Sequence, residues 1–440
     1  MLTFCRPASH NGVGRKVRPL REAGFRFPVS RLPAIALLIA VPLWHAAAEQ
    51  CTPTTSPQVD SEIAKLQRLT KIQTTDPVLL YNLAADFAAK CDRATTLNLL
   101  GKVAAAGGGL DPAEYRGFAF LKDSADFKAI VAQVRATNSP RIQSAPAFLI
   151  KEPDLFPEGM AYARCSGRVY AGSVKRKIVW TDKTRTVHDL VKPSEDGLGY
   201  VAGLHVDEAR KELWAVSSRF GNAPEIASAI QGLFKYDLVS GKRVAKFAAP
   251  NSSGGFLNDV TVVSSTGDAF VTDTLEGSVY STVKGSQVLQ TFLPPGSIPG
   301  ANGIALSDDE RTLFVAGDFG IYRVDLATKA FKMLAKSEGV IDASIDGLYF
   351  YRQSLVGIQN GIHPGRVVRF YLDPGLARIT RREILETYNP LFENPTTGGL
   401  DGDSFLFMAN PQLHKWTPGK PSPPAARLQD IRILRIALDH

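Results

Sequence analysis

From residue 148 onward, apolar and polar positions alternate with the period of two that is typical of β-strands. The stretch "IPGANGIALSDDERTLFVAG" (298–317) contains a short strand, an acidic turn and a second strand, which together predict a hairpin. Five other segments have the same pattern: "EGMAYARCSGRVYAGS", "AGLHVDEARKELWAVS", "NDVTVVSSTGDAFVTD", "DGLYFYRQSLVGIQ" and "GGLDGDSFLFMAN". The hairpin is therefore a repeated unit.

The spacing of the hairpins predicts a propeller. They begin 44, 56, 44, 44 and 52 residues apart, at Glu158, Ala202, Asn258, Asn302, Asp346 and Gly398. Several repeats carry a third strand, at 178–182, 233–238, 321–326 and 367–372. About 40–45 residues in three to four strands make one propeller blade, and a closed ring of blades exposes no long sheet edge. We therefore predict an all-β, six-bladed β-propeller over 148–440, with 431–438 as a strand that helps to close the circle.

The segment before the propeller has helical periodicity, over residues 59–136. Asp76 and Pro77 form a helix start signal, and "LDPAEY" repeats it at Asp111, with Glu114 placed for a capping box. A helix pair of this period is similar to a tetratricopeptide unit. Two interpretations stay open: a small helical cap packed on the propeller, or a module that binds a protein partner. Residues 137–147 are the predicted linker.

The N-terminus has the form of a secretory signal over residues 1–48. A basic start precedes "LPAIALLIAVPLWHAAAEQ", whose alanines 46–48 form an A-x-A cleavage site. The alternative is an uncleaved N-terminal anchor. No later stretch approaches the roughly 20 apolar residues that a membrane-spanning helix needs. We expect a periplasmic or secreted protein with no transmembrane span in the mature chain.

Charge argues against a nucleic-acid partner. The 440-residue chain has a formal net charge of +8, but residues 1–31 carry seven basic side chains against one acid, which leaves about +2 for the rest. A body this close to neutral lacks the basic surface that nucleic-acid binding requires.

Cysteine usage fits an exported protein. Removal of the signal would leave Cys51, Cys91 and Cys165. The favoured disulfide joins Cys51 to Cys91, and the alternative is three unlinked thiols. No cysteine spacing matches a zinc site.

The residues that begin the hairpins carry the candidate chemistry. The innermost strands of a propeller line its axis, so residues at one register position form a ring. Four of the six ring positions hold short oxygen-bearing side chains: Glu158, Asn258, Asn302 and Asp346. Two carboxylates and two amides suit a hard divalent cation, with Ca²⁺ favoured and other divalent cations compatible. The alternative is that Asn-Gly, Asn-Asp and Asp-Gly are ordinary turn dipeptides.

A family resemblance becomes specific at these residues. "FPEGMAY", "FLNDVTV", "ANGIALSDDERTLFVAG" and "IDGLYF" resemble the metal-binding motifs of the senescence-marker-protein, gluconolactonase and luciferin-regenerating-enzyme family. They are also similar to those of diisopropylfluorophosphatase and the paraoxonases. The resemblance covers roughly 148–440 and implies a catalytic Ca²⁺ at the central tunnel. Its implied ligands are Glu158, Asn258, Asn302 and Asp346, with Asp259 in a supporting position.

Departures from the family pattern bear on the substrate. Phe256 stands where sugar-acid lactonases of the family carry an arginine, and "MAY" replaces an expected tryptophan. Ala202 stands where paraoxonase-like enzymes place a histidine, and His205 lies further along the strand. The resemblance therefore implies a small-molecule substrate more apolar than a sugar-acid lactone.

The predicted reaction is metal-dependent hydrolysis of a lactone or ester, with phosphoester hydrolysis left open. Asp346 is the expected base or nucleophile, Glu158 holds the metal, and His363 is a candidate proton relay. Loops on the ring's face offer further substrate-side residues: Arg219, Asp273, Asp318 and Asn410. The longer loop 217–232 could form a lid.

A second hypothesis is a non-catalytic exported propeller. In this case Ca²⁺ is structural or the tunnel binds a ligand, and the helical segment recruits a partner.

Overall fold

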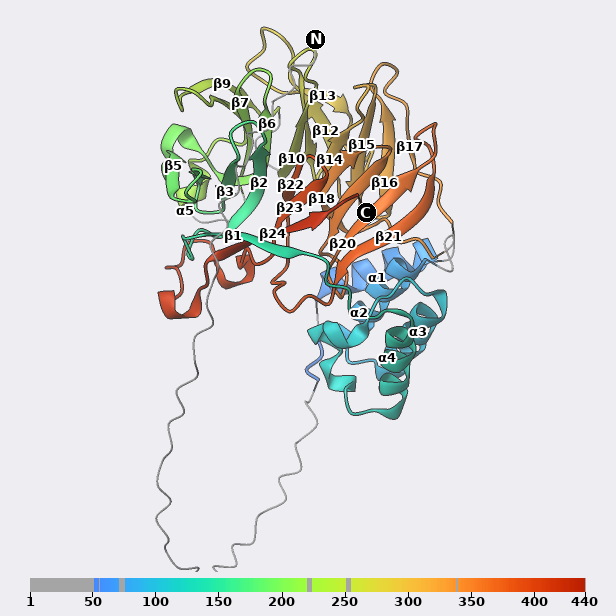
Figure 1. Ribbon diagram of the computed structural model, residues 1–440. Helices are drawn as coiled ribbons and strands as arrows, with labels where there is room; N and C mark the ends of the chain where they lie inside the picture. Colours follow the sequence, from blue (N-terminus) through green and yellow to red (C-terminus); the bar gives the residue numbers. More distant parts are fainter. Residues whose placement is uncertain are drawn as a thin grey trace, which may run out of the picture. The chain divides into compact units, whose positions relative to one another are not determined.

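The computed structural model describes residues 51–54, 56–70, 76–219, 224–250, 255–337 and 339–439. The secretory signal predicted for 1–48 lies outside these residues. The chain from Cys51 onward forms one compact unit of a helical segment and a β-propeller (Figure 1). Within the described residues, no helix combines the length and hydropathy needed to cross a membrane.

The propeller consists of six four-stranded sheets, as predicted. Blade one holds β2 (Pro157–Ala163), β3 (Arg168–Ser173), β4 (Lys177–Thr181) and β5 (Val187–Val191). Blade two holds β6 (Tyr200–Asp207), β7 (Glu212–Ser218), β8 (Gly232–Asp237) and β9 (Arg243–Ala248). Blade three holds β10 (Leu257–Val262), β11 (Ala269–Asp273), β12 (Ser278–Ser281) and β13 (Gln290–Leu293).

The remaining blades follow the same order. Blade four holds β14 (Ile304–Leu306), β15 (Thr312–Gly317), β16 (Gly320–Asp325) and β17 (Phe331–Met333). Blade five holds β18 (Ile345–Tyr351), β19 (Ser354–Gln359), β20 (Arg366–Leu372) and β21 (Ile379–Thr387). Blade six holds β22 (Gly398–Asp401), β23 (Ser404–Met408), β24 (Ile431–Ala437) and β1 (Ala145–Ile150).

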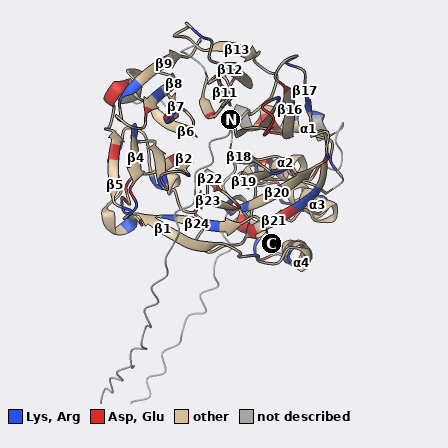
Figure 2. Cartoon of the chain, turned by 45° about the horizontal axis from the view of Figure 1, so that its top comes forward, with Lys and Arg blue, Asp and Glu red and all other residues tan. Residues whose placement is uncertain are grey.

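The first strand of each repeat lies innermost. The strands β2, β6, β10, β14, β18 and β22 contact one another in succession, and β22 contacts β2 to complete the ring. Figure 2 shows β2, β6, β18 and β22 near the centre and β5, β9, β13 and β17 at the rim. The register argument, which places the ring residues around the axis, is therefore sound.

Both ends of the propeller sequence close the circle. The strand β24 pairs with β23, and β1 pairs with the outer side of β24, with Phe148 opposite Ile433. The prediction that 431–438 helps to close the ring is confirmed. The outermost strand of this blade is β1, which begins at Ala145, so the predicted linker of 137–147 is too long at its end and the propeller begins three residues earlier than predicted.

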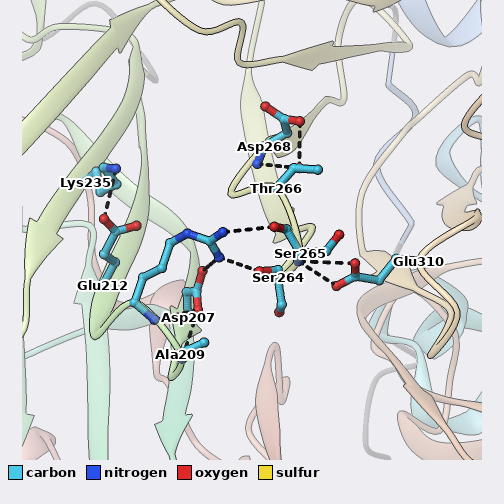
Figure 3. Close-up of polar contacts among 10 residues, drawn as sticks. Asp207, Ala209, Glu212, Lys235, Ser264, Ser265, Thr266, Asp268 and Glu310 are labelled. Atoms are coloured by element: carbon cyan, nitrogen blue, oxygen red, sulfur yellow. Dashed lines mark hydrogen bonds and ion pairs between the residues drawn. The ribbon is translucent and has the colours of Figure 1, made fainter. Parts of the chain in front are cut away.

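Turns at the end of the propeller opposite the ring residues link neighbouring blades (Figure 3). Arg210 of the β6–β7 turn pairs with Asp207 at 2.9 Å, and its Nη2 donates to the carbonyl of Ser265 in the β10–β11 turn. The amide of Ser265 donates in turn to the carboxylate of Glu310 in the β14–β15 turn, at 3.2 Å. Polar contacts therefore join blades two, three and four in sequence.

The helical segment contains α1 (Pro57–Thr70), α2 (Pro77–Ala89), α3 (Arg93–Ala106) and α4 (Ala125–Thr137). Asp76 caps α2 as expected, accepting from the amides of Val78 and Leu79 at 2.9 and 3.0 Å. The disulfide predicted between Cys51 and Cys91 is present.

The second helix start, predicted at Asp111, is confirmed, but no α-helix follows it directly. Residues Pro112–Glu114 and Arg116–Leu121 form short 3₁₀ helices instead. Asp111 caps the first of them through the amide of Ala113 at 2.9 Å. Glu114 is not part of a capping box: it pairs with Arg135 of α4 at 3.1 Å.

The apolar core of the helical segment continues into the propeller. Buried residues of α1–α4 form one cluster with Ile341, Ala343 and Ile362, which belong to loops of blade five. The buried guanidinium of Arg366 donates to the carbonyl of Gly108 at 2.7 Å. The segment is therefore packed on the propeller as a cap, and partner binding through it stays a prediction.

Closure of the ring by β24 is testable with a matched pair of substitutions. Ile433 of β24 is fully buried, whereas Ile142 is 55% exposed. We expect Ile433→Ala to lower the free energy of unfolding by about 2–5 kcal/mol, because the substitution leaves a cavity between blades. Ile142→Ala should change it by less than about 0.5 kcal/mol. Equal effects in urea denaturation would contradict the closure.

Candidate functional site

Irregularities in the inner strands surround the ring residues. The register of the first strand shifts between Pro157 and Met160, and again at the same place in blades two, three and five. Such bulges re-aim side chains and are common beside functional sites. The residues within the four shifts include Glu158, Ala202, Asn258 and Asp346. In blade four, Asn302 lies two residues before β14, and its backbone amide donates to the carbonyl of Ala316 at 2.9 Å.

Glycines beside the ring residues bring adjacent blades close together. Gly159, Gly203 and Gly303 do not have the positive φ that turn glycines adopt. A Cβ on each would lie within 2.1–2.6 Å of a backbone carbonyl of the next blade. These carbonyls belong to Ala202, Asn258 and Asp346. The glycines therefore permit the close approach of inner strands. The dipeptides at 258–259 and 346–347 lie within the strands β10 and β18, so the alternative that they are turns is wrong.

Two oxygens of the ring are buried and have no hydrogen-bond partner among the described residues. They are Oε2 of Glu158 and Oδ1 of Asn302. The other two ring side chains are oriented by neighbours: Asn258 donates to Oγ1 of Thr274 at 2.9 Å, and Asp346 accepts from Nδ2 of Asn360 at 2.6 Å. Buried oxygens without donors are costly. A divalent cation is a partner that would satisfy them, so the residues present fit Ca²⁺.

The two carboxylates influence each other. Burial, with the nearby charge of Asp346, raises the pKa of Glu158 well above its usual value. Burial also raises the pKa of Asp346 to about 6, against the lowering effect of hydrogen bonds from Asn360 and Asn302. Like charges in a buried site disfavour ionisation, and a bound cation reverses that effect.

The composition of the ring differs from that of a zinc centre. In the described part of the chain, no group of three or more His, Cys, Asp or Glu side chains is arranged to hold a metal ion. The ring contributes two carboxylates, Glu158 and Asp346, and its other oxygens are amides. Amide oxygens together with carboxylates are characteristic of calcium rather than zinc ligation.

Asp259 supports the ring from beside Asn258. Its two oxygens accept from the amides of Val260 at 2.9 Å and Ile304 at 3.2 Å, so it ties blade three to blade four. Burial raises its pKa to about 7. Its side chain therefore spans the gap to the next inner strand, where the other blades use glycine.

Sequence reasoning missed the residues that hold the ring in place. Thr274 and Asn360 each directly follow a second strand, β11 and β19. Thr396 and Thr397 donate their hydroxyls to the carbonyl of Glu158 at 2.9 and 2.7 Å. Tyr349 accepts from the amide of Gly398 at 2.7 Å. Thr274 and Asn360 each occupy the first position after the second strand of a blade. To identify them from the sequence, one would need to know where each second strand ends to within one residue.

Two loop residues expected on the substrate side make contacts within their own blades. Asp273, the last residue of β11, is buried and accepts from the amides of Phe256 and Glu276, both at 3.0 Å. Asn410 is buried and accepts from the amide of Arg432 at 2.6 Å. Hydrogen bonds within the blade therefore satisfy the buried polar groups of Asp273 and Asn410 without a ligand.

The other substrate-side predictions have varied settings. Arg219 is half-buried just after β7, and Asp318 is exposed just after β15. The side chain of Phe256 packs against the core shared by blades two and three. The predicted lid lies partly outside the described residues, and its described part includes the short helix α5 (Pro224–Ala227).

Burial lowers the pKa of both His363 and His205. His363 is half-buried in the loop after β19, its ring 5.1 Å from that of Tyr115, and burial lowers its pKa. Its Nδ1 is buried without a hydrogen-bond partner in the described part of the chain. His205 of β6 has its pKa lowered to about 4 by burial. A relay role for His363 stays a prediction.

Comparisons with known proteins concern the fold. No protein-family model matches the chain, and no curated protein matches its sequence. Among solved structures, the calcium-binding protein regucalcin from Agrobacterium tumefaciens is 17% identical over 67% of this chain and 93% of its own, with a TM-score of 0.45. A gluconolactonase from Xanthomonas campestris is 16% identical over 67% of this chain and 96% of its own, with a TM-score of 0.42. These values carry no argument about activity.

The raised pKa of Asp346 predicts a pH-dependent stability without metal. A carboxyl whose folded-state pKa is about 6 favours folding below its unfolded pKa near 4 and loses that contribution as the pH rises through 6. In chelator, we expect the unfolding free energy of the wild type, relative to Asp346→Asn, to fall by about 1 kcal/mol from pH 5 to pH 8. Ca²⁺ should abolish the fall. Urea denaturation in chelator measures the difference in unfolding free energy between the wild type and Asp346→Asn. If this difference does not change between pH 5 and pH 8, the raised pKa of Asp346 is contradicted.

Proposed function

We propose that this chain is an exported, Ca²⁺-dependent hydrolase acting on a lactone or ester. The observation that supports the proposal is that Glu158, Asn258, Asn302 and Asp346 lie at or just before the starts of inner strands of one ring, and that two of their oxygens are buried without a hydrogen-bond partner among the described residues. A purely structural ring of polar side chains would be expected to satisfy its own hydrogen bonds.

In the proposed site, Glu158, Asn258 and Asn302 hold the cation together with Asp346. When bound, Ca²⁺ would supply Lewis-acid polarisation of a carbonyl oxygen and neutralise the two carboxylates. The hydroxyls of Thr396 and Thr397 fix the backbone of Glu158, and Thr274 fixes the amide of Asn258. The ligands are thus positioned before any substrate arrives, which reduces the reorganisation needed during the reaction.

Asp346 is the group to which we assign the proton transfer or the nucleophilic attack. Asn360 donates to only one of its oxygens, Oδ2, and thereby orients the carboxylate. A pKa raised to about 6 brings a carboxylate closer to the operating pH than an exposed aspartate, and this improves a general base. Asp259 is fully engaged by backbone amides and is therefore a positioning residue.

The substrate proposal rests on position 256. Phe256 provides an apolar side chain where a guanidinium would attract a sugar-acid carboxylate. Its backbone is held by Asp273 and its ring packs on the core of blades two and three. We therefore propose a substrate without a carboxylate, drawn from neutral lactones and aryl esters.

Kinetics with a panel of neutral lactones and aryl esters tests the proposal. We expect hydrolysis that requires Ca²⁺ and falls by at least about 100-fold in kcat for Asp346→Asn, because the proton acceptor is lost. Asp126→Asn, which removes an exposed carboxylate of α4, should retain activity within about twofold. A wild type that is stabilised by Ca²⁺ but hydrolyses no member of the panel would contradict the enzyme proposal and favour a structural metal.

A further inference from the structure

A cavity of about 540 Å³ lies between the helical segment and blade five. Its walls come from three parts of the chain: Glu114 of the helical segment, the loop 360–365 after β19, and the connection 388–395 from blade five to blade six. This volume is within the usual range for small-molecule sites. Neither the propeller nor the helical segment encloses the cavity alone.

Two walls of the cavity lead directly to the carboxylates of the ring. Asn360 lines the cavity and donates to Asp346 at 2.6 Å. Pro395 lines the cavity, and the next two residues, Thr396 and Thr397, hold the carbonyl of Glu158. The cavity is therefore adjacent to the ring on the side where Glu158 and Asp346 lie.

The helical segment contacts both walls through one buried residue, Asp111. The backbone amide of Asp111 donates to the backbone carbonyl of His363 at 2.8 Å. Its Oδ2 accepts from the hydroxyl of Tyr388 at 2.9 Å and pairs with Arg135. Asp111 is fully buried, so these bonds are shielded from water. A cap whose only purpose was to cover apolar surface would not require this polar connection to two cavity loops.

We infer that the helical segment completes the substrate-binding site, and that this cavity binds the neutral, hydrogen-bonding part of the substrate. The inference rests on the proposed function for the reaction but makes a separate claim about binding. Amide, imidazole and phenol groups line the cavity beside proline and phenylalanine: Asn360, His363, Tyr388, Asn394, Pro390 and Phe392. This mixture suits a ring bearing hydroxyl or amide groups.

Charge sets the expected selectivity. Glu114 is the charged residue among those that line the cavity, and no lysine or arginine is among them. Arg135 pairs with both Glu114 and the buried Asp111, so this group of three carries a net charge of −1. A carboxylate on the ligand would meet repulsion and no cationic partner. The site should therefore select against anionic ligands.

Binding of two inert lactams tests the inference without requiring hydrolysis. Pyroglutaminol is neutral, and pyroglutamate has the same ring with a carboxylate. By ligand-observed NMR, we expect the wild-type protein to bind pyroglutaminol at least about fivefold more tightly than pyroglutamate. The ratio of the two dissociation constants is the quantity measured for each variant. Glu114→Gln should narrow the ratio, and Glu114→Lys should remove or reverse it. Asp123→Lys is the matched control, because Asp123 is an exposed carboxylate of the same segment that does not line the cavity.

The outcomes separate this inference from the proposed function. Suppose that Glu114→Lys changes the ratio of the two lactam affinities, that Asp123→Lys does not, and that the two variants have equal melting temperatures. This result supports the cavity as the binding site even if no lactone is hydrolysed. A ratio that neither substitution changes, or the absence of lactam binding to the wild type, overturns the cavity as the binding site even if Ca²⁺-dependent hydrolysis is found.

Discussion

The close approach of the inner strands around the axis is the constraint on which the site depends. A Cβ at Gly303 would lie 2.1 Å from the carbonyl of Asp346, and one at Gly159 would lie 2.4 Å from that of Ala202. Blade three has Asp259 at this position, and its carboxylate bonds across to the amide of Ile304 instead. Because adjacent strands approach this closely, side chains one residue earlier converge on a small volume. Larger residues at the glycine positions would spread the blades and separate the ring oxygens.

The burial of two carboxylates near the axis has an electrostatic cost, because no cationic side chain among the described residues pairs with Glu158 or Asp346. Burial raises the pKa of both Glu158 and Asp346, and the charge of Asp346 raises that of Glu158 further. Threonine and asparagine side chains orient the ring groups without neutralising them. This combination of positioned but uncompensated oxygens is what a cation site requires. The same arrangement connects Asp346 by one hydrogen bond to Asn360, which lines a cavity.

The propeller was predictable because its signals repeat. Six hairpins at related intervals specified the blades, the innermost strand and the ring position, since a register repeated around an axis leaves little freedom. In the helical segment, the helix starts predicted at Asp76 and Asp111 are both present. The predicted capping box of Glu114 is not, because Glu114 pairs with Arg135, and the carboxylate of Asp111 also bonds to Arg135 and Tyr388. The hydrogen bond from Tyr388 to Asp111 joins residues 277 positions apart and has no local pattern. For the same reason the role of Glu114 at the cavity could not be inferred from sequence. Asn360 could not be inferred as the partner of Asp346 because that requires knowing the residue at which β19 ends.

Isothermal titration of the metal-free protein with Ca²⁺ tests the central claim most directly, for the wild type and for Asn302→Ala. Asn98→Ala, an exposed asparagine of α3, is the matched control. The ring predicts about one Ca²⁺ per chain in the wild type and the control, and binding at least about tenfold weaker in Asn302→Ala, which lacks one ligand oxygen. Titrations in which the wild type binds no Ca²⁺, or in which Asn302→Ala binds it as tightly as the control, would contradict the account.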